Sequence, residues 1–242
     1  MSQVVYLTRM LADVPADRGW LTPAERDIAD RLRFDKRRKD WLLGRWTAKQ
    51  ALMRAAGQDD AALARWQVLP DEDRAPCIYL DGKSSIASVS LSHSDGAALC
   101  ALSPAGIAVG CDIEQIADRD AAFLETFFTI AERSAVNAAP DALRGLLTTL
   151  IWSAKESVLK LIRKGLSVDT WSVPVEPPAL PLARDRWQPL RARYTPGREA
   201  FDGWWRHDGR MVWTLLSARG DGEPTSLDTN TNKGQPGCVA RN

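Results

Sequence analysis

The segment Gly110-Cys111-Asp112-Ile113-Glu114 carries two carboxylates two residues apart. In a β-strand, alternate side chains point to the same face, so Asp112 and Glu114 would point together while Gly110 leaves that face uncrowded. Two convergent carboxylates are hard oxygen ligands that suit Mg²⁺, an ion that usually keeps several waters and binds substrate phosphates. The alternative is a pair of acids at a strand end that face solvent or an arginine. The pattern therefore indicates a candidate metal site and leaves that alternative open.

The segment from Ile151 to Leu166 has the apolar spacing of an amphipathic helix. On its other face Trp152, Glu156 and Lys160 recur every four residues, and Lys155 lies at the edge of the apolar stripe. Glu156 could supply a third carboxylate or a general base, and the two lysines could neutralise phosphate beside a metal, as phosphoryl transfer requires. Taken alone, however, Glu156 and Lys160 favour an ordinary surface pair one helical turn apart.

Candidates for binding an anion also lie in the first half of the chain. His93 follows a strand-like run and could donate hydrogen bonds to a phosphate, although a histidine in a turn is more often simply solvated. The run 35–45 is basic, and Arg45 and Lys49 lie one helical turn apart. These cations could hold a polyanion or form a solvated helix face.

These residues fall on a mixture of helices and strands. Strand patterns occupy residues 4–8, 85–103 (two strands around a turn at Ser94-Asp95-Gly96), 106–114 and 211–218. The sequence predicts a helix from Thr22-Pro23 to Gly57, and helical regions at 123–147 and 151–166. Residues 221–242 have hardly any apolar side chains, which predicts a disordered tail.

The bulk composition excludes several classes of protein. The chain has 242 residues, 45% of them hydrophobic, which is enough for a substantial core. A formal net charge of +1 argues against a general binder of nucleic acid or of membrane surfaces. No apolar run approaches a membrane span, the N-terminus lacks a signal-peptide pattern, and the four cysteines form no CxxC pair. We therefore expect a cytoplasmic, disulfide-free enzyme or binding protein.

Two stretches of the chain resemble each other. Residues 45–54 (RWTAKQALMR) align without gaps with residues 151–160 (IWSAKESVLK), so that Lys49 matches Lys155 and Gln50 matches Glu156. The match predicts a duplicated α+β unit whose halves are related by a pseudo-twofold axis. A seam between similar halves is a natural place for a ligand cleft.

The ordered set of motifs resembles the Sfp-type 4′-phosphopantetheinyl transferases. The order is GRWTAK, SLSHS, VGCDIE, FFTIAE and WSAKESVLK, and the resemblance covers roughly residues 20 to 220. The strongest signatures of the family are its G-x-D-I-E strand and its W-x-x-K-E-[SA]-x-x-K helix, and both are complete here. The resemblance implies an α+β, pseudo-dimeric fold with its active site at the seam. The halves would be residues 1–106, which hold coenzyme A, and 107–220, which carry the metal and catalytic residues, with 221–242 as a tail.

The resemblance also implies a reaction and a role for each motif residue. Family members use Mg²⁺ and transfer the phosphopantetheine arm of coenzyme A to a serine of an acyl or peptidyl carrier protein. By position, Asp112, Glu114 and Glu156 would hold Mg²⁺, and Glu156 would also deprotonate the serine, directly or through a water. Lys160 would stabilise charge on the leaving phosphate, and Lys155 would contact the pyrophosphate or the pantetheine arm. The residues expected to bind coenzyme A in the first half are Arg45, Lys49, Arg74, Ser92 and His93, and Glu132 matches the family's F-x-x-x-E element.

The chain departs from the family pattern at two places. Many relatives have a basic residue where Ile28 stands here, and Arg26 or Arg31 could take over its contact with the 3′-phosphate. Relatives often read G-K-P where this chain has Arg74-Ala75-Pro76, so the cation could have moved to Arg74 or be absent.

The resulting prediction is a cytoplasmic, monomeric transferase that acts on carrier proteins of fatty-acid, polyketide or nonribosomal peptide synthesis. One rival is a regulatory protein of the same fold that binds coenzyme A without catalysis, and the complete set of acidic and basic motif residues argues against it. A second rival is a nucleic-acid-binding module built on the basic run at Lys36–Lys39, which the near-neutral charge and the carboxylates disfavour.

Overall fold

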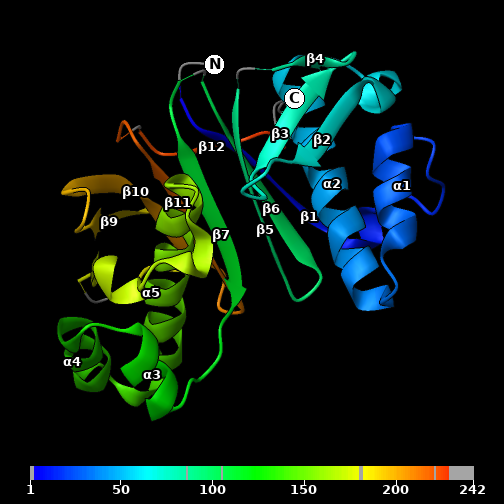
Figure 1. Ribbon diagram of the computed structural model, residues 1–242. Helices are drawn as coiled ribbons and strands as arrows, with labels where there is room; N and C mark the ends of the chain where they lie inside the picture. Colours follow the sequence, from blue (N-terminus) through cyan, green and yellow to red (C-terminus); the bar gives the residue numbers. More distant parts are fainter. Residues whose placement is uncertain (1–2, 86, 105, 180–181, 221, 229–242) are drawn as a thin grey trace, which may run out of the picture.

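Two sheets meet along the middle of the molecule, and each is covered by one long helix (Figure 1). The computed structural model describes residues 3–85, 87–104, 106–179, 182–220 and 222–228. The strands are β1 (Val5–Met10), β2 (Trp66–Pro70), β3 (Pro76–Leu80), β4 (Lys83–Ser84), β5 (Ser88–Ser94), β6 (Ala97–Ser103), β7 (Val109–Gln115), β8 (Val175–Glu176), β9 (Gln188–Tyr194), β10 (Glu199–His207), β11 (Met211–Ser217) and β12 (Thr225–Ser226). The helices are α1 (Pro23–Arg31), α2 (Asp35–Ala55), α3 (Ala121–Phe127), α4 (Ile130–Ala138) and α5 (Asp141–Leu161), with short 3₁₀ turns at Leu11–Asp13, Asp60–Arg65, Gly165–Ser167 and Thr170–Ser172.

The two larger sheets share part of their strand order, because β1-β6-β5 in the first corresponds to β7-β11-β10 in the second. One sheet has the order β12-β1-β6-β5 and the other β7-β11-β10-β9-β8, while β2-β3-β4 form a small separate sheet. The long helix α2 packs on β1 and β6, and α5 packs on β7 and β11 in the same way. We call the elements from β1 to β6 the N-terminal half and those from β7 to β11 the C-terminal half. The mixture of helices and sheets confirms the predicted α+β class.

The predicted strands are confirmed, but two predicted helices are broken. The 22–57 helix divides because Leu32 and Phe34 have extended backbones, so α1 ends at Arg31 and α2 begins at Asp35. The helical region at 123–147 divides into α3, α4 and the start of α5. Thr129 caps α4 with its side chain, and Pro140 immediately precedes α5. A side chain that caps the start of a helix, or a proline before it, fixes where that helix begins and so separates it from the preceding helix.

A buried ion pair ties the first helix of the N-terminal half to α2. Thr22 and Glu25 form a capping box at the start of α1. The Oε2 atom of Glu25 also accepts a hydrogen bond from Lys49 Nζ at 2.7 Å, and its Oε1 atom accepts one from the Val68 amide at 2.9 Å. Both charged side chains are fully buried, and the lysine also donates to the carbonyl of Trp20 at 2.6 Å.

The C-terminal half contains the same arrangement. Thr129 and Glu132 form a capping box at the start of α4. Glu132 Oε2 lies 3.0 Å from Lys155 Nζ, and Glu132 Oε1 accepts a hydrogen bond from the Val175 amide at 2.7 Å. Glu25 with Lys49, and Glu132 with Lys155, thus occupy equivalent places in the two halves. These contacts extend the predicted internal repeat to a second pair of sequence positions.

An apolar core joins the two sheets. Side chains at alternate positions of β7 (Val109, Cys111 and Ile113) pack into it together with Tyr6 and Leu99 of the N-terminal half. The three residues alternate along the strand and therefore share one face of it. Further cores lie between α2 and its sheet and between α5 and its sheet.

Gly110 allows α5 to approach β7 closely. A Cβ atom at this position would lie 1.9 Å from the Ser157 carbonyl oxygen and 2.9 Å from the Leu161 Cβ atom. Only glycine fits such a contact between a strand and a helix backbone. The glycine therefore brings the strand that carries Asp112 against the helix that carries Glu156 and Lys160.

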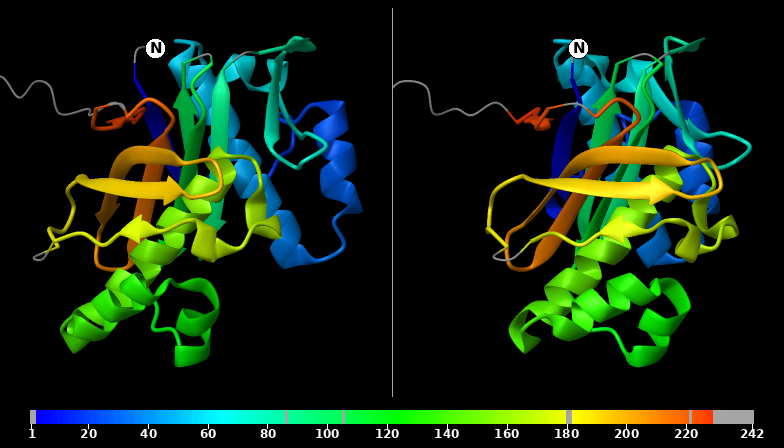
Figure 2. Two further views of the ribbon diagram at one scale, coloured as in Figure 1. Left: turned by 60° about the vertical axis from the view of Figure 1, so that its left-hand side comes forward. Right: turned by 90° about the vertical axis from the view of Figure 1, so that its left-hand side faces the viewer.

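The predicted tail is ordered over part of its length, so the prediction is wrong for residues 222–228. Within them β12 pairs in parallel with β1, placing this segment beside the N-terminal strand (Figure 2). Asp228 accepts hydrogen bonds from Arg9 at 2.9 and 3.0 Å and from Arg54 at 2.7 Å. These charge pairs and the partly buried Leu227 compensate for the low apolar content of the segment. Residues 221 and 229–242 lie outside the described part of the chain.

The structure also bears on the predictions about membrane spans and disulfides. Among the described residues, no helix is long and apolar enough to cross a membrane. Cys77, Cys100 and Cys111 carry free thiols, and Cys238 lies outside the described residues.

Candidate functional site

Asp112 lies at the centre of a polar cluster between β5, β7 and α5. Its carboxylate accepts hydrogen bonds on Oδ1 from Lys160 Nζ at 2.7 Å and from Ser92 Oγ at 2.6 Å. The residue is only 2% exposed. Within the described part of the chain, its Oδ2 atom is buried and has no hydrogen-bond partner. A buried carboxylate oxygen without a donor is costly, and such an atom is a candidate ligand for a cation.

Two further carboxylates lie close enough to Asp112 for its charge to affect their pKa values. Burial, followed by the negative charge of Asp112, raises the pKa of Glu114, although Ser94 Oγ donates to Glu114 Oε2 at 3.1 Å. Burial and then Asp112 also raise the pKa of Glu156, to about 7. The Oε1 atom of Glu156 is buried with no partner among the described residues. The charge of Asp112 therefore acts on both Glu114 and Glu156.

Lys160 connects this cluster to the nearest pocket. Burial is the largest influence on the pKa of Lys160 and lowers it, but the neighbouring acids, Asp112 first, outweigh burial and raise the pKa overall. The lysine therefore stays charged at neutral pH and offsets part of the negative charge of the three carboxylates.

A row of serines on β5 holds the acidic strand in place. Ser90, Ser92 and Ser94 alternate along the strand, so their hydroxyls point to the same side, toward β7. Ser90 accepts a hydrogen bond from the Cys111 amide at 2.9 Å, while the next two serines donate to Asp112 and Glu114. Ser92 was expected to contact phosphate, but its hydroxyl is bonded to Asp112 here, so it orients a carboxylate. The S-x-S-x-S alternation is the sequence signal that could have identified this row.

A pocket of about 420 Å³ opens at the seam between the two halves. It is lined from the N-terminal half by the loop before β3 and by β5, and from the C-terminal half by the start of β7 and the end of α5. Its volume falls in the range of small-molecule sites. Of the residues predicted from the sequence, Arg74 and Lys160 line this pocket, which we call the seam pocket.

Two lysines that were predicted to contact coenzyme A are buried. Lys155 and Lys49 were both expected to bind coenzyme A, but neither side chain has any exposed surface. Lys155 donates to the carbonyls of Thr170 and Val173, each at 2.8 Å, in addition to its pairing with Glu132. Both ammonium groups are therefore bound to acceptors inside their own halves. The repeated T-x-x-E capping boxes were the sequence signal for this structural role.

Arg45 and His93 lie outside the lining of the seam pocket. The Arg45 guanidinium carbon lies 4.9 Å from the ring centre of Trp41, and burial lowers the pKa of Arg45 to about 10, against the opposing charge of Glu25. His93 is exposed on β5. Neighbouring atoms partly exclude water from its ring and lower its pKa, and among the nearby charges Asp40 raises it while Lys160 lowers it. Contact between either residue and a ligand stays a prediction.

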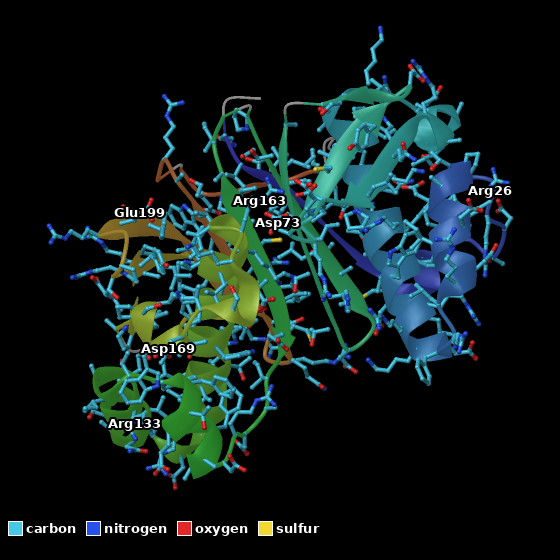
Figure 3. The ribbon with its side chains drawn as sticks, viewed as in Figure 1. Arg26, Asp73, Arg133, Arg163, Asp169 and Glu199 are labelled. Carbon is cyan, nitrogen blue, oxygen red and sulfur yellow. The ribbon has the colours of Figure 1, made fainter. Side chains whose placement is uncertain are left out.

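Other residues that the sequence singled out have mainly structural surroundings. The Trp152 indole packs edge-on against Phe123 and Phe127, with ring centres 5.2 and 5.0 Å apart, and so joins α5 to α3. Arg26, the suggested substitute at the Ile28 position, is exposed on α1. Figure 3 shows it on the opposite side of the N-terminal half from Arg163 and Asp73 at the seam.

The donor set fits a hard divalent cation. Asp112 and Glu156 each offer a buried carboxylate oxygen that has no partner among the described residues, and Glu114 lies beside them. Mg²⁺ is usually bound through one or two carboxylates and several waters. In the described ranges, no three histidine, cysteine or acidic side chains form a ready-made metal cluster. A Mg²⁺ ion bound by these residues would need waters or a substrate to complete its coordination.

Part of the chain matches a known family. Residues 108–204 match the family described as the 4′-phosphopantetheinyl transferase superfamily. The matched stretch contains Asp112, Glu114, Glu156 and Lys160, and it confirms the resemblance at the level of the superfamily for that part of the chain. No curated protein sequence matches the chain.

Proposed function

We propose that this protein transfers the 4′-phosphopantetheine group of coenzyme A to a serine hydroxyl of an acyl or peptidyl carrier protein, with adenosine 3′,5′-bisphosphate as the other product. The observation that carries the proposal is the cluster of Asp112, Glu114 and Glu156 with Lys160, next to the seam pocket and within the stretch that matches the superfamily. We further propose a monomeric, cytoplasmic enzyme of the Sfp type that serves fatty-acid, polyketide or nonribosomal peptide synthesis.

The residues of the cluster fit the steps of this transfer. The serine oxygen forms a bond to the phosphorus of the phosphopantetheine group, and the bond from that phosphorus to the bridging pyrophosphate oxygen breaks. The leaving adenosine 3′,5′-bisphosphate takes the electron pair of that bond. Glu156 is the proposed acceptor of the serine proton, because its buried Oε1 atom has no partner among the described residues and its carboxylate lies in the acidic cluster around Asp112. Lys160 is the proposed cation beside the oxygen that gains charge.

Asp112, Glu114 and Glu156 are the residues that would hold Mg²⁺. The bound ion would supply positive charge to the pyrophosphate. The contacts of Asp112 support this role, because Ser92 and Lys160 both bond to Oδ1 and leave Oδ2 available. Ser94 holds Glu114 in the same way.

The proposal is tested by incubating the purified protein with coenzyme A, MgCl₂ and a panel of apo carrier proteins, and then measuring intact masses. At least one carrier protein should gain the mass of one phosphopantetheine group, and a chelator should abolish the gain. Glu156→Gln should nearly abolish transfer. The matched control is Glu199→Gln, which removes an exposed acid on β10, far from the seam (Figure 3), and should transfer at the parental rate.

Two outcomes would contradict the proposal. Coenzyme A binding by calorimetry without transfer to any carrier protein would favour the regulatory alternative. A protein that binds no coenzyme A at all would refute both readings.

A further inference from the structure

An ion-pair cluster connects the two halves at the rim of the seam pocket. Arg163 follows α5, and Asp71 and Asp73 lie in the loop between β2 and β3. Arg163 Nη2 lies 2.7 Å from Asp71 Oδ2 and 3.0 Å from Asp73 Oδ1, and Arg163 Nε lies 3.0 Å from Asp73 Oδ2. Asp73, Arg74 and Arg163 line the pocket. Figure 3 shows Asp73 and Arg163 together at the seam.

The two aspartates also shape the loop that they belong to. The Asp71 carboxylate accepts a hydrogen bond from the Glu72 amide at 2.7 Å, and the Asp73 carboxylate accepts one from the Ala75 amide at 3.2 Å. The loop is closed by backbone hydrogen bonds from Asp71 to Ala75 and from Arg74 to Asp71. Arg163 therefore holds the same carboxylates that give the loop its shape, and with it the position of Arg74.

The backbone at Arg163 is unusual for an arginine. Its φ angle is +57°, in the left-handed region, directly after the last turn of α5. The amides of Arg163 and Lys164 donate back to the carbonyls of Lys160 and Leu159, at 3.1 and 3.0 Å, which is the helix ending that normally takes glycine. Glycine takes this backbone without strain, so a substitution of Arg163 by glycine removes the side chain without disturbing the end of α5.

The charges at the rim matter for an anionic ligand. Asp71 and Asp73 place two negative charges beside the pocket, and Arg163 is their cationic partner from the other half. The side chains are between 39% and 48% exposed, so these pairs add little to the stability of the fold. Without the arginine, the two carboxylates would repel coenzyme A, which carries about four negative charges near pH 7.

We propose that Arg163 is a positioning residue for nucleotide binding: by clamping Asp71 and Asp73 across the seam, it holds the Arg74 loop at the pocket rim and cancels the negative charge there. The identity of the ligand rests on the proposed function. The clamp itself rests only on the contacts between the two halves.

The test compares three variants with the parent. Arg163→Gly removes the side chain and relieves the backbone, so folding is preserved. Arg163→Lys retains the charge. A triple variant, Asp71→Asn with Asp73→Asn and Arg163→Gly, removes the repulsion as well as the clamp. We expect Arg163→Gly to raise the Kd and KM for coenzyme A about tenfold, the change that 1.4 kcal/mol produces, with kcat within about twofold of the parent. The lysine and triple variants should each recover part of the affinity.

Two readouts decide the outcome. Parental Kd and KM in Arg163→Gly would overturn the proposal, as would a loss confined to kcat, because that would place Arg163 in the chemical step. Hydrogen exchange at the Asp71 and Arg74 amides reports the clamp independently of any ligand. Exchange at these amides should speed up in Arg163→Gly, and unchanged exchange would refute the clamp. A parent protein that binds no coenzyme A would instead refute the proposed function, and with it the ligand part of this inference.

Discussion

Replacing Lys155 with methionine separates a structural role for this lysine from the ligand contact that the motif suggests. The Lys155 ammonium has three acceptors, Glu132 Oε2 at 3.0 Å and the carbonyls of Thr170 and Val173 at 2.8 Å, and no exposed surface. Burial lowers its pKa, while the charge of Glu132 raises it. Methionine keeps most of the volume of the side chain and removes the charge. Lys155→Met therefore leaves the Glu132 carboxylate buried without its counterion.

The contacts that Glu132 would keep place the expected loss in the free energy of unfolding at the lower end of the range for broken buried ion pairs. Removing one partner of a buried ion pair costs about 3–5 kcal/mol. Glu132 would keep hydrogen bonds from the Thr129 and Val175 amides, each at 2.7 Å, so we expect a loss of about 3 kcal/mol. For a chain of this length, that corresponds to a decrease in Tm of about 6–12 °C. The double variant Lys155→Met/Glu132→Gln removes both charges and should recover more than half of the loss.

The assay is urea unfolding of the two variants and the parent, beside the KM for coenzyme A of the folded fraction. Lys49→Met is the matched control, because Lys49 and Glu25 form the equivalent pair in the N-terminal half at 2.7 Å. Both single variants should lose stability, and Lys155→Met should leave the KM unchanged. A Lys155→Met protein with parental stability and a KM raised tenfold would refute this reasoning and restore the ligand contact.

Three further predictions concern the acid cluster, the close contact of α5 and the C-terminal segment. In the presence of a chelator, the stability of the parent should fall as pH rises from about 4.5 through 7, because the folded protein holds the Glu156 proton more tightly than the unfolded chain does. Glu156→Gln should flatten this profile in thermal melts at pH 5 to 8, and equal slopes for both proteins would contradict the burial of Glu156. Gly110→Ala should cost about 1–3 kcal/mol through its clash with the Ser157 carbonyl, whereas the control Gly44→Ala, where a Cβ meets nothing within 4 Å, should be neutral or stabilising in chemical denaturation. Truncation after residue 219 should lower Tm by a few degrees relative to truncation after residue 228, because only the shorter chain loses β12 and the bonds of Asp228 to two arginines, and equal Tm values would show that this segment adds nothing.

Local rules in the sequence were sufficient for the strand and helix that carry the proposed site residues. Alternation placed Asp112 and Glu114 on one side of β7, and four-residue spacing placed Glu156 and Lys160 on one side of α5. The turn between β5 and β6 was also predictable, because Asp95 and Gly96 both take the left-handed backbone that a tight hairpin needs.

Only the tertiary structure decided which charged side chains face the seam and which are buried within one half. Lys155 and Glu156 are neighbours in the sequence, yet the helix turns them in different directions, and the partner of Lys155 lies on α4. Arg163 and Asp73 are 90 positions apart, so no local pattern could pair them. The same reason applies to residues 222–228, whose composition predicts disorder but which gain partners on β1 and α2. Spacing along the chain determines the direction of a side chain relative to its own helix or strand, whereas the charge or surface that it meets depends on packing between distant segments.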